Sequence, residues 1–165
     1  MTEPLACPGC GYEASPEEGP SHAYMHSSAA CWRAFNTIMA REYGSAVLME
    51  THYLSVDAFA AQHPGDHDER RARQSVWIHL AGLHAVLRQG RLPEYRYALL
   101  RRLADTHDSW PPPPSHAPFA ITAGSLPEEM DEAQHAAAMR DWAEATLRAY
   151  ETANPDLATQ LEALG

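Results

Sequence analysis

Residues 28–63 read SAACWRAFNTIMAREYGSAVLMETHYLSVDAFAAQH. In the first half of this stretch, Cys31, Phe35 and Ile38 follow one another at spacings of four and three residues, which places their side chains on one face of a helix. A serine at position 27 or 28 is a typical helix N-cap, and Gly44 is a typical helix end. The pattern therefore predicts a helix over residues 28–43.

The second half of the stretch continues with the same helical period. Pro64-Gly65 directly follows it and stops a helix. We therefore expect a second helix over residues 45–62, antiparallel to the first and joined to it at Gly44. Its inward stripe contains Leu48, His52, Val56, Phe59 and His63.

Helical periodicity also dominates the rest of the chain, and no segment alternates with a period of two. Further helices are predicted over residues 69–89, from Pro93 onward with Tyr97, Leu100 and Leu103 inward, over residues 126–152 behind a Ser125/Glu128 capping box, and from Asn154-Pro155-Asp156 onward. The proline run within residues 107–118 predicts an extended strap.

The expected fold is thus an all-α, single-domain helical bundle with an irregular N-terminal zinc-knuckle segment. Its parts are a metal-knuckle segment over 1–27, a helical core over 28–106, a Pro-rich strap over 107–125 and C-terminal helices over 126–165.

Composition limits the classes of protein to consider. The chain has 165 residues, of which 45% are hydrophobic, so it can bury one core without disulfides. Its net charge of −10 argues against a nucleic-acid partner, and no stretch is apolar enough for a membrane span. All basic residues are arginines, which suggests a GC-rich bacterial source and excludes lysine chemistry. We expect a cytoplasmic protein.

Three cysteines form the most specific motif of the chain. Cys7-Pro8-Gly9-Cys10-Gly11 has the spacing of half a tetrahedral zinc site, and Cys31 lies in the first turn of the first predicted helix. In a reducing compartment an odd number of thiols favours metal ligation over disulfide pairing. Three sulfur ligands favour zinc over magnesium, calcium or manganese.

The spacing alone leaves the fourth ligand open among three histidines. His22 would complete a compact site within the N-terminal segment. In an antiparallel hairpin of the first two helices, His52 and His63 lie about 8–9 Å along the axis on either side of the level of Cys31. Both histidines share the inward stripe of the second helix.

A second possible site consists of histidines on three predicted helices. His52, His63, His79 and His135 each neighbour apolar stripe residues, and converging imidazoles in a helical bundle can bind a catalytic metal, as in DinB-like bundles. Its second-shell or acid–base partners would be Glu42, Asp57 and Gln62. This arrangement would indicate a metal-dependent hydrolase or a thiol transferase.

Several blocks of sequence resemble a bacterial family of unknown function. The blocks are the Cys-Pro-x-Cys-Gly knuckle, the Cys31-Trp32 helix start and the stretch Val56-Asp57-Ala58-Phe59-Ala60-Ala61-Gln62-His63-Pro64-Gly65. Members of that family are small helical proteins with no established activity. Some lack the histidine that matches His22 and keep those that match His52 and His63, so the resemblance implies a fourth ligand on the second helix. The motif positions matched here are Cys7, Cys10, His22, Cys31, His52, Asp57, Gln62, His63 and His79.

From these observations we predict a zinc-binding helical protein whose metal has a structural role and which acts as a binding or regulatory module. The predicted metal ligands are Cys7, Cys10 and Cys31 with His63 or His52. The expected partner is an unidentified protein or small molecule, a second copy of the chain included. A metal-dependent hydrolase or thiol transferase is the alternative.

Overall fold

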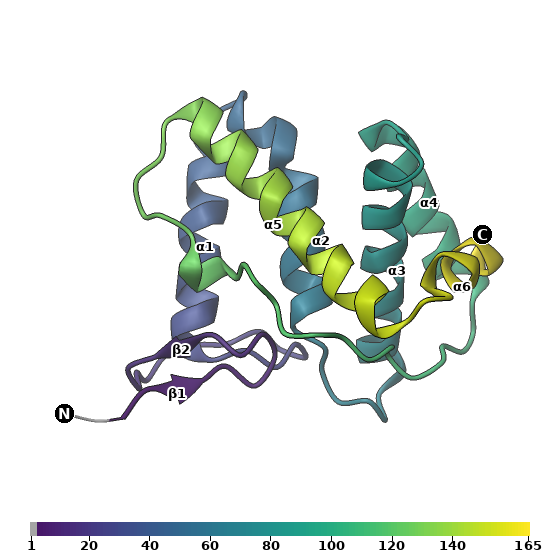
Figure 1. Ribbon diagram of the computed structural model, residues 1–165, viewed down its shortest axis with the longest axis horizontal. Coiled ribbons are helices and arrows are strands. Elements are labelled where there is room, and N and C mark those ends of the chain that lie inside the picture. Colours follow the sequence, from purple (N-terminus) through teal and green to yellow (C-terminus); the bar gives the residue numbers. More distant parts are fainter. Residues whose placement is uncertain (1–2) are drawn as a thin grey trace.

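The computed structural model describes residues 3–165, and helices make up most of it (Figure 1). A short antiparallel strand pair lies beside the start of the first helix. The described elements are β1 (Leu5–Ala6), β2 (Glu13–Ala14), α1 (Ala29–Tyr43), η1 (Leu48–Thr51), α2 (His52–Gln62), α3 (Arg70–Leu87), α4 (Pro93–Thr106), η2 (Ala123–Ser125), α5 (Glu132–Ala153) and α6 (Leu157–Leu164). The all-α fold class is confirmed.

Helix α1 begins and ends where its sequence predicts. The Ser28 hydroxyl accepts a hydrogen bond from the Cys31 amide at 3.1 Å, so Ser28 is the N-cap. At the other end, the Gly44 amide donates to the last carbonyls of the helix. The predicted inward residues Phe35 and Ile38 are buried, and so is Met39 beside them.

The second predicted helix is divided in two. Residues 48–51 form the 3-10 turn η1, and the α-helix α2 begins only at His52. The hydroxyl of Thr51 donates to the Leu48 carbonyl at 3.1 Å, and this local bond competes with the α-helical pattern. The prediction of one continuous helix over 45–62 is therefore wrong at its start.

The fifth predicted helix begins later than expected. Leu126 precedes Pro127 and has an extended backbone, because a residue before proline avoids the α region. The Ser125 side chain bonds to Thr122 instead of capping a helix. Asp131 is the observed N-cap, and the last helix likewise begins two residues later than Pro155, at Leu157.

The core lies where α2, α3 and α5 pack together, and α4 and α6 cover α3 from outside (Figure 1). Leu100 and Leu103 of α4 are buried as predicted, whereas Tyr97 is 53% exposed, so its inward placement is wrong. The largest fully buried side chains include Trp142, Tyr150, Phe59, Leu54, Leu80 and Leu83.

Residues 107–122 form an extended connection between α4 and η2, and part of it passes along α3. The indole Nε1 of Trp77 donates to the Pro111 carbonyl at 3.0 Å, which fixes the proline run against the helix. No helix in residues 3–165 has both the length and the apolar character of a membrane-spanning segment.

Candidate metal centre

Four side chains from three parts of the chain meet beside the strand pair. Cys7 and Cys10 come from the turn between β1 and β2, Cys31 from the first turn of α1, and His63 from the residue that follows α2. One ligand atom from each lies within 4.8 Å of the other three. Cys31 and His63 are completely buried, and Cys7 and Cys10 are nearly so.

The knuckle has the backbone of a tight turn. The Cys7 amide donates to the Tyr12 carbonyl at 2.8 Å, and the Gly11 amide donates to the Cys7 carbonyl at 2.9 Å. Gly11 has a φ of 78°, a conformation that glycine adopts at no steric cost. The Ser28 amide donates to Cys7 Sγ at 3.2 Å, so the start of α1 also contacts the knuckle.

A backbone carbonyl orients the His63 imidazole. His63 Nδ1 lies 2.7 Å from the Phe59 carbonyl oxygen, which can only accept, so Nδ1 carries the proton. The unprotonated Nε2 then faces Cys31 Sγ at 3.2 Å. This arrangement is typical of metal-binding histidines, whose second nitrogen bonds to a carbonyl or carboxylate.

The spacing of the ligand atoms fits a tetrahedral ion. Cys10 Sγ and Cys31 Sγ are 3.6 Å apart. With metal–sulfur distances near 2.3 Å and a metal–nitrogen distance near 2.0 Å, a tetrahedron has sulfur–sulfur edges of about 3.8 Å and sulfur–nitrogen edges of about 3.5 Å. A small inward or outward shift of each side chain would therefore complete the coordination.

Mutual hydrogen bonds and burial shift the pKa values of the three thiols in opposite directions. Hydrogen bonds from Cys10 and Cys31 hold the pKa of Cys7 below its usual range despite burial. Hydrogen bonding to Cys31 lowers the pKa of Cys10, but the bond to Cys7 and burial outweigh it and raise the pKa to about 12. Bonds to Cys10 and Cys7, with burial, also raise the pKa of Cys31. Metal binding would therefore displace thiol protons.

The other two candidate fourth ligands lie outside the cluster. His22 Nδ1 accepts hydrogen bonds from the Tyr24 and Met25 amides, so this nitrogen stabilises the turn at residues 22–25. His52 begins α2, at the opposite end of that helix from His63, and its Nδ1 lies 2.8 Å from a Glu42 carboxylate oxygen.

The four histidines that the sequence placed on three helices do not meet at one site. His52 and His135 bind the two oxygens of the buried Glu42 carboxylate, at 2.8 and 3.0 Å, and the Ser55 hydroxyl donates to it at 2.9 Å. His135 Nδ1 is buried without a partner in residues 3–165. The expectation of one imidazole-lined site is therefore wrong, since His52 and His135 share Glu42, whereas His63 bonds to the Phe59 carbonyl and His79 to Asp57.

His79 belongs to a third, separate group. Its Nδ1 lies 2.6 Å from Asp57 Oδ1, and the Arg96 guanidinium donates to both oxygens of the same buried carboxylate. Gly82 allows this approach, because a Cβ there would lie 2.7 Å from Asp57 Oδ2. Within residues 3–165, the cysteine cluster is the one place where three or more possible metal ligands come this close together.

Sequence reasoning did not find the groups that support the four ligands. The Phe59 carbonyl and the Ser28 amide are backbone atoms, so no residue type marks them in the sequence. Gly9 also supports the site, because an added Cβ there would lie 2.6 Å from the His63 ring. The sequence did indicate this residue, since a glycine inside a knuckle is typical of close backbone approach. Gln62, the predicted partner of a catalytic site, instead donates to the Ile121 carbonyl and to Thr146.

A family model described as a family of unknown function, DUF5946, matches residues 5–151. The match includes the whole cysteine–histidine cluster and ends within α5. No curated protein and no solved structure matches the chain.

Proposed function

The chain belongs to DUF5946, a family of unknown function, and we propose that it binds one structural zinc ion through Cys7, Cys10, Cys31 and His63. The observation that carries the proposal is the meeting of four buried ligand atoms within 4.8 Å. The ion would fasten the N-terminal segment to α1 and to the end of α2. The protein is then a metal-stabilised binding or regulatory module.

The donor set supports zinc as the ion. Three thiolates and one imidazole are the ligands of common structural zinc sites, and such sulfur-rich sets reject magnesium, calcium and manganese. Copper(I) and iron also accept thiolates, so the identity of the ion is a point for measurement.

Burial supports a structural role over a catalytic one. Catalytic zinc sites keep a position for water beside three protein ligands, whereas structural sites are closed by four. All four ligands here are buried. The alternative, a metal-dependent hydrolase or thiol transferase, would need an open histidine site. The separation of His63 and His79 from the His52–Glu42–His135 group argues against it.

The test is the metal content and coordination of the purified protein. We expect one zinc per chain by elemental analysis. X-ray absorption should give sulfur at about 2.3 Å and nitrogen at about 2.0–2.1 Å in a ratio of three to one. Protein without stoichiometric metal, or with oxygen in the coordination shell, would contradict the proposal.

Matched histidine variants identify the fourth ligand. His63→Ala should lower zinc affinity by more than about tenfold, because loss of a group that only orients a ligand already costs about 10–100-fold. His22→Ala and His52→Ala should keep one zinc per chain, because both imidazoles lie outside the cluster. Zinc content is the measured quantity, since His52→Ala also removes a buried bond to Glu42.

A further inference from the structure

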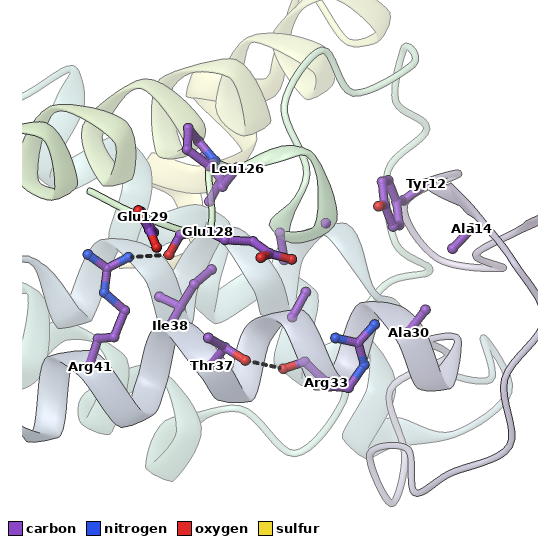
Figure 2. A pocket seen from close by; sticks show the side chains of 14 residues that line it. Tyr12, Ala14, Ala30, Arg33, Thr37, Ile38, Arg41, Leu126, Glu128 and Glu129 are labelled. Atoms are coloured by element: carbon purple, nitrogen blue, oxygen red, sulfur yellow. Dashed lines mark hydrogen bonds between the residues drawn. The ribbon is translucent and has the colours of Figure 1, made fainter.

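A groove lies between α1 and the segment that leads from η2 toward α5 (Figure 2). Its volume is about 500 Å³, within the usual range of binding pockets of about 300–1,000 Å³. The apolar part of its lining, called the floor below, consists of small or apolar side chains from α1 and from the facing segment, namely Ala30, Ala34, Ile38, Ala123 and Leu126. This space can accept a few side chains of a partner and not a folded domain.

The knuckle forms one end of the groove. Tyr12 follows the turn that carries Cys7 and Cys10, and its ring lies against Gly124, where an added Cβ would come within 2.2 Å of the ring. The wall that Tyr12 provides therefore depends on the position of the knuckle. In this way the candidate metal centre supports the groove without lining it.

The arginines that line the groove already have partners. Arg41 donates to the Met130 carbonyl at 2.6 Å and so fastens the segment to α1. Arg33 forms a bidentate pair with Glu17. Figure 2 shows both arginines rising from α1.

The acidic residues on the rim are unpaired. Glu128 and Glu129 are exposed, and their carboxylates make no ion pair or hydrogen bond with residues 3–165. With Glu17 counted beside Arg33, the groove and its rim carry three carboxylates against the two guanidiniums of Arg33 and Arg41, a net charge of −1 beside an apolar floor. Charge complementarity therefore favours a cationic occupant with apolar side chains.

We propose that this groove docks a basic amphipathic segment of a partner protein. Apolar side chains of the segment would pack on the floor formed by Ala34 and Ile38, and its lysines or arginines would pair with Glu128 and Glu129. This inference names the partner of the binding module proposed above. It rests on that proposed function in one respect, because the bound metal would hold the knuckle that positions Tyr12.

The experiment measures fluorescence anisotropy of a labelled amphipathic leucine–lysine peptide added to the zinc-loaded chain. A peptide with glutamate in place of lysine is the charge control. We expect saturable binding of the first peptide and none of the second. Glu128→Gln with Glu129→Gln should weaken binding about three- to tenfold, as the loss of two exposed ion pairs does.

The matched control changes the same number of charges elsewhere. Asp105 and Asp108 are exposed near the end of α4, away from the groove. Asp105→Asn with Asp108→Asn should change binding less than about twofold, because screening removes distant charges. Ala34→Leu should abolish binding by filling the floor, and circular dichroism with zinc content confirms that each variant folds.

Several outcomes would overturn the proposal. These are equal binding of the glutamate peptide, equal loss in the Asp105/Asp108 variant, or unchanged binding in Ala34→Leu. Self-association in sedimentation velocity that Ala34→Leu abolishes would show that the occupant is a second copy instead. Zinc content is measured on the same samples. Peptide binding without zinc would contradict the metal proposal and the metal support of Tyr12, but not the docking site, whereas bound zinc without peptide binding would contradict only the docking proposal.

Discussion

Gly9 shows how one residue can control the candidate metal centre. A Cβ at this position would lie 2.4 Å from the His26 carbonyl oxygen and 2.6 Å from the His63 ring. Backbone and a buried imidazole cannot move away at low cost. Gly9→Ala should therefore displace His63, reduce zinc affinity and destabilise the fold by about 1–3 kcal/mol.

Competition with a chromophoric chelator and urea denaturation measure the two effects of Gly9→Ala. Gly19→Ala is the matched control, because its Cβ would make an ordinary contact with Ala29 at 3.5 Å. Equal zinc affinities of the two variants would show that Gly9 does not position the imidazole.

The sequence was informative about the cysteines and less so about the histidine. The Cys7–Cys10 spacing is local, so a knuckle could be expected before any tertiary structure was known. The choice between His52 and His63 depends on the backbone after α2, where His63 has a φ of −125° and bonds back to Phe59. Helical periodicity places both on one stripe and does not describe that turn.

At the scale of the elements, α5 is capped by the Asp131/Gln134 box and not by the Ser125/Glu128 box expected from the sequence. The Asp131 carboxylate accepts from the Gln134 amide at 2.8 Å, and the Gln134 side chain accepts from the Asp131 amide at 2.9 Å. Asp131→Ala should lower the free energy of unfolding by about 0.5–2 kcal/mol. Glu128→Ala, in the box expected from sequence, should leave it nearly unchanged, and thermal denaturation compares the two. A larger loss of stability in Glu128→Ala than in Asp131→Ala would place the helix start at Leu126.

The end of α2 is closed by a side chain of α5. The Tyr150 hydroxyl donates to the Ala61 carbonyl at 2.5 Å in a fully buried position, and burial raises the pKa of Tyr150. An unfolded tyrosine ionises near pH 10, so above that pH the unfolded state loses this proton first. The stabilisation is therefore complete below about pH 10 and declines as the pH rises further.

Tyr150→Phe isolates this contribution. The variant should be less stable than the natural chain by about 1–3 kcal/mol near neutral pH, because the Ala61 carbonyl loses its buried donor. The difference in unfolding free energy should shrink above about pH 10, because only the natural chain must keep this hydroxyl protonated in the folded state while the unfolded state ionises. Urea denaturation at both pH values gives the difference, and a constant difference would contradict the ionisation argument.

At the scale of the whole molecule, the fold class could be predicted because helical periods cover most of the chain. The arrangement of the helices could not, since the crossing of α5 over α2 depends on contacts between distant residues. The buried polar contacts between helices could not be predicted from the sequence for the same reason. Glu42 and His135 lie far apart in the sequence, and their bond at 3.0 Å exists only once α5 has packed.

Helix α1 is fastened to α2 at both of its ends. Cys31 meets His63 at the knuckle end, and Glu42 binds His52 and Ser55 at the other. Between them, the rings of Phe35 and Phe59 stack at 3.9 Å. Zinc would hold only the first of these two contacts between α1 and α2. Stability measurements on zinc-loaded protein therefore keep the first contact constant while the Glu42 contact is changed.

Glu42→Ala tests that second contact. The change leaves His52, Ser55 and His135 without their common acceptor in the interior, which should lower the free energy of unfolding by about 3–5 kcal/mol. Glu42→Gln keeps one acceptor and should cost less. Urea denaturation of the zinc-loaded variants measures both, and hydrogen exchange should show the amides of α1 losing more protection than those of α3. A loss below about 1 kcal/mol for Glu42→Ala would mean that the apolar contacts of α1 hold it without this carboxylate.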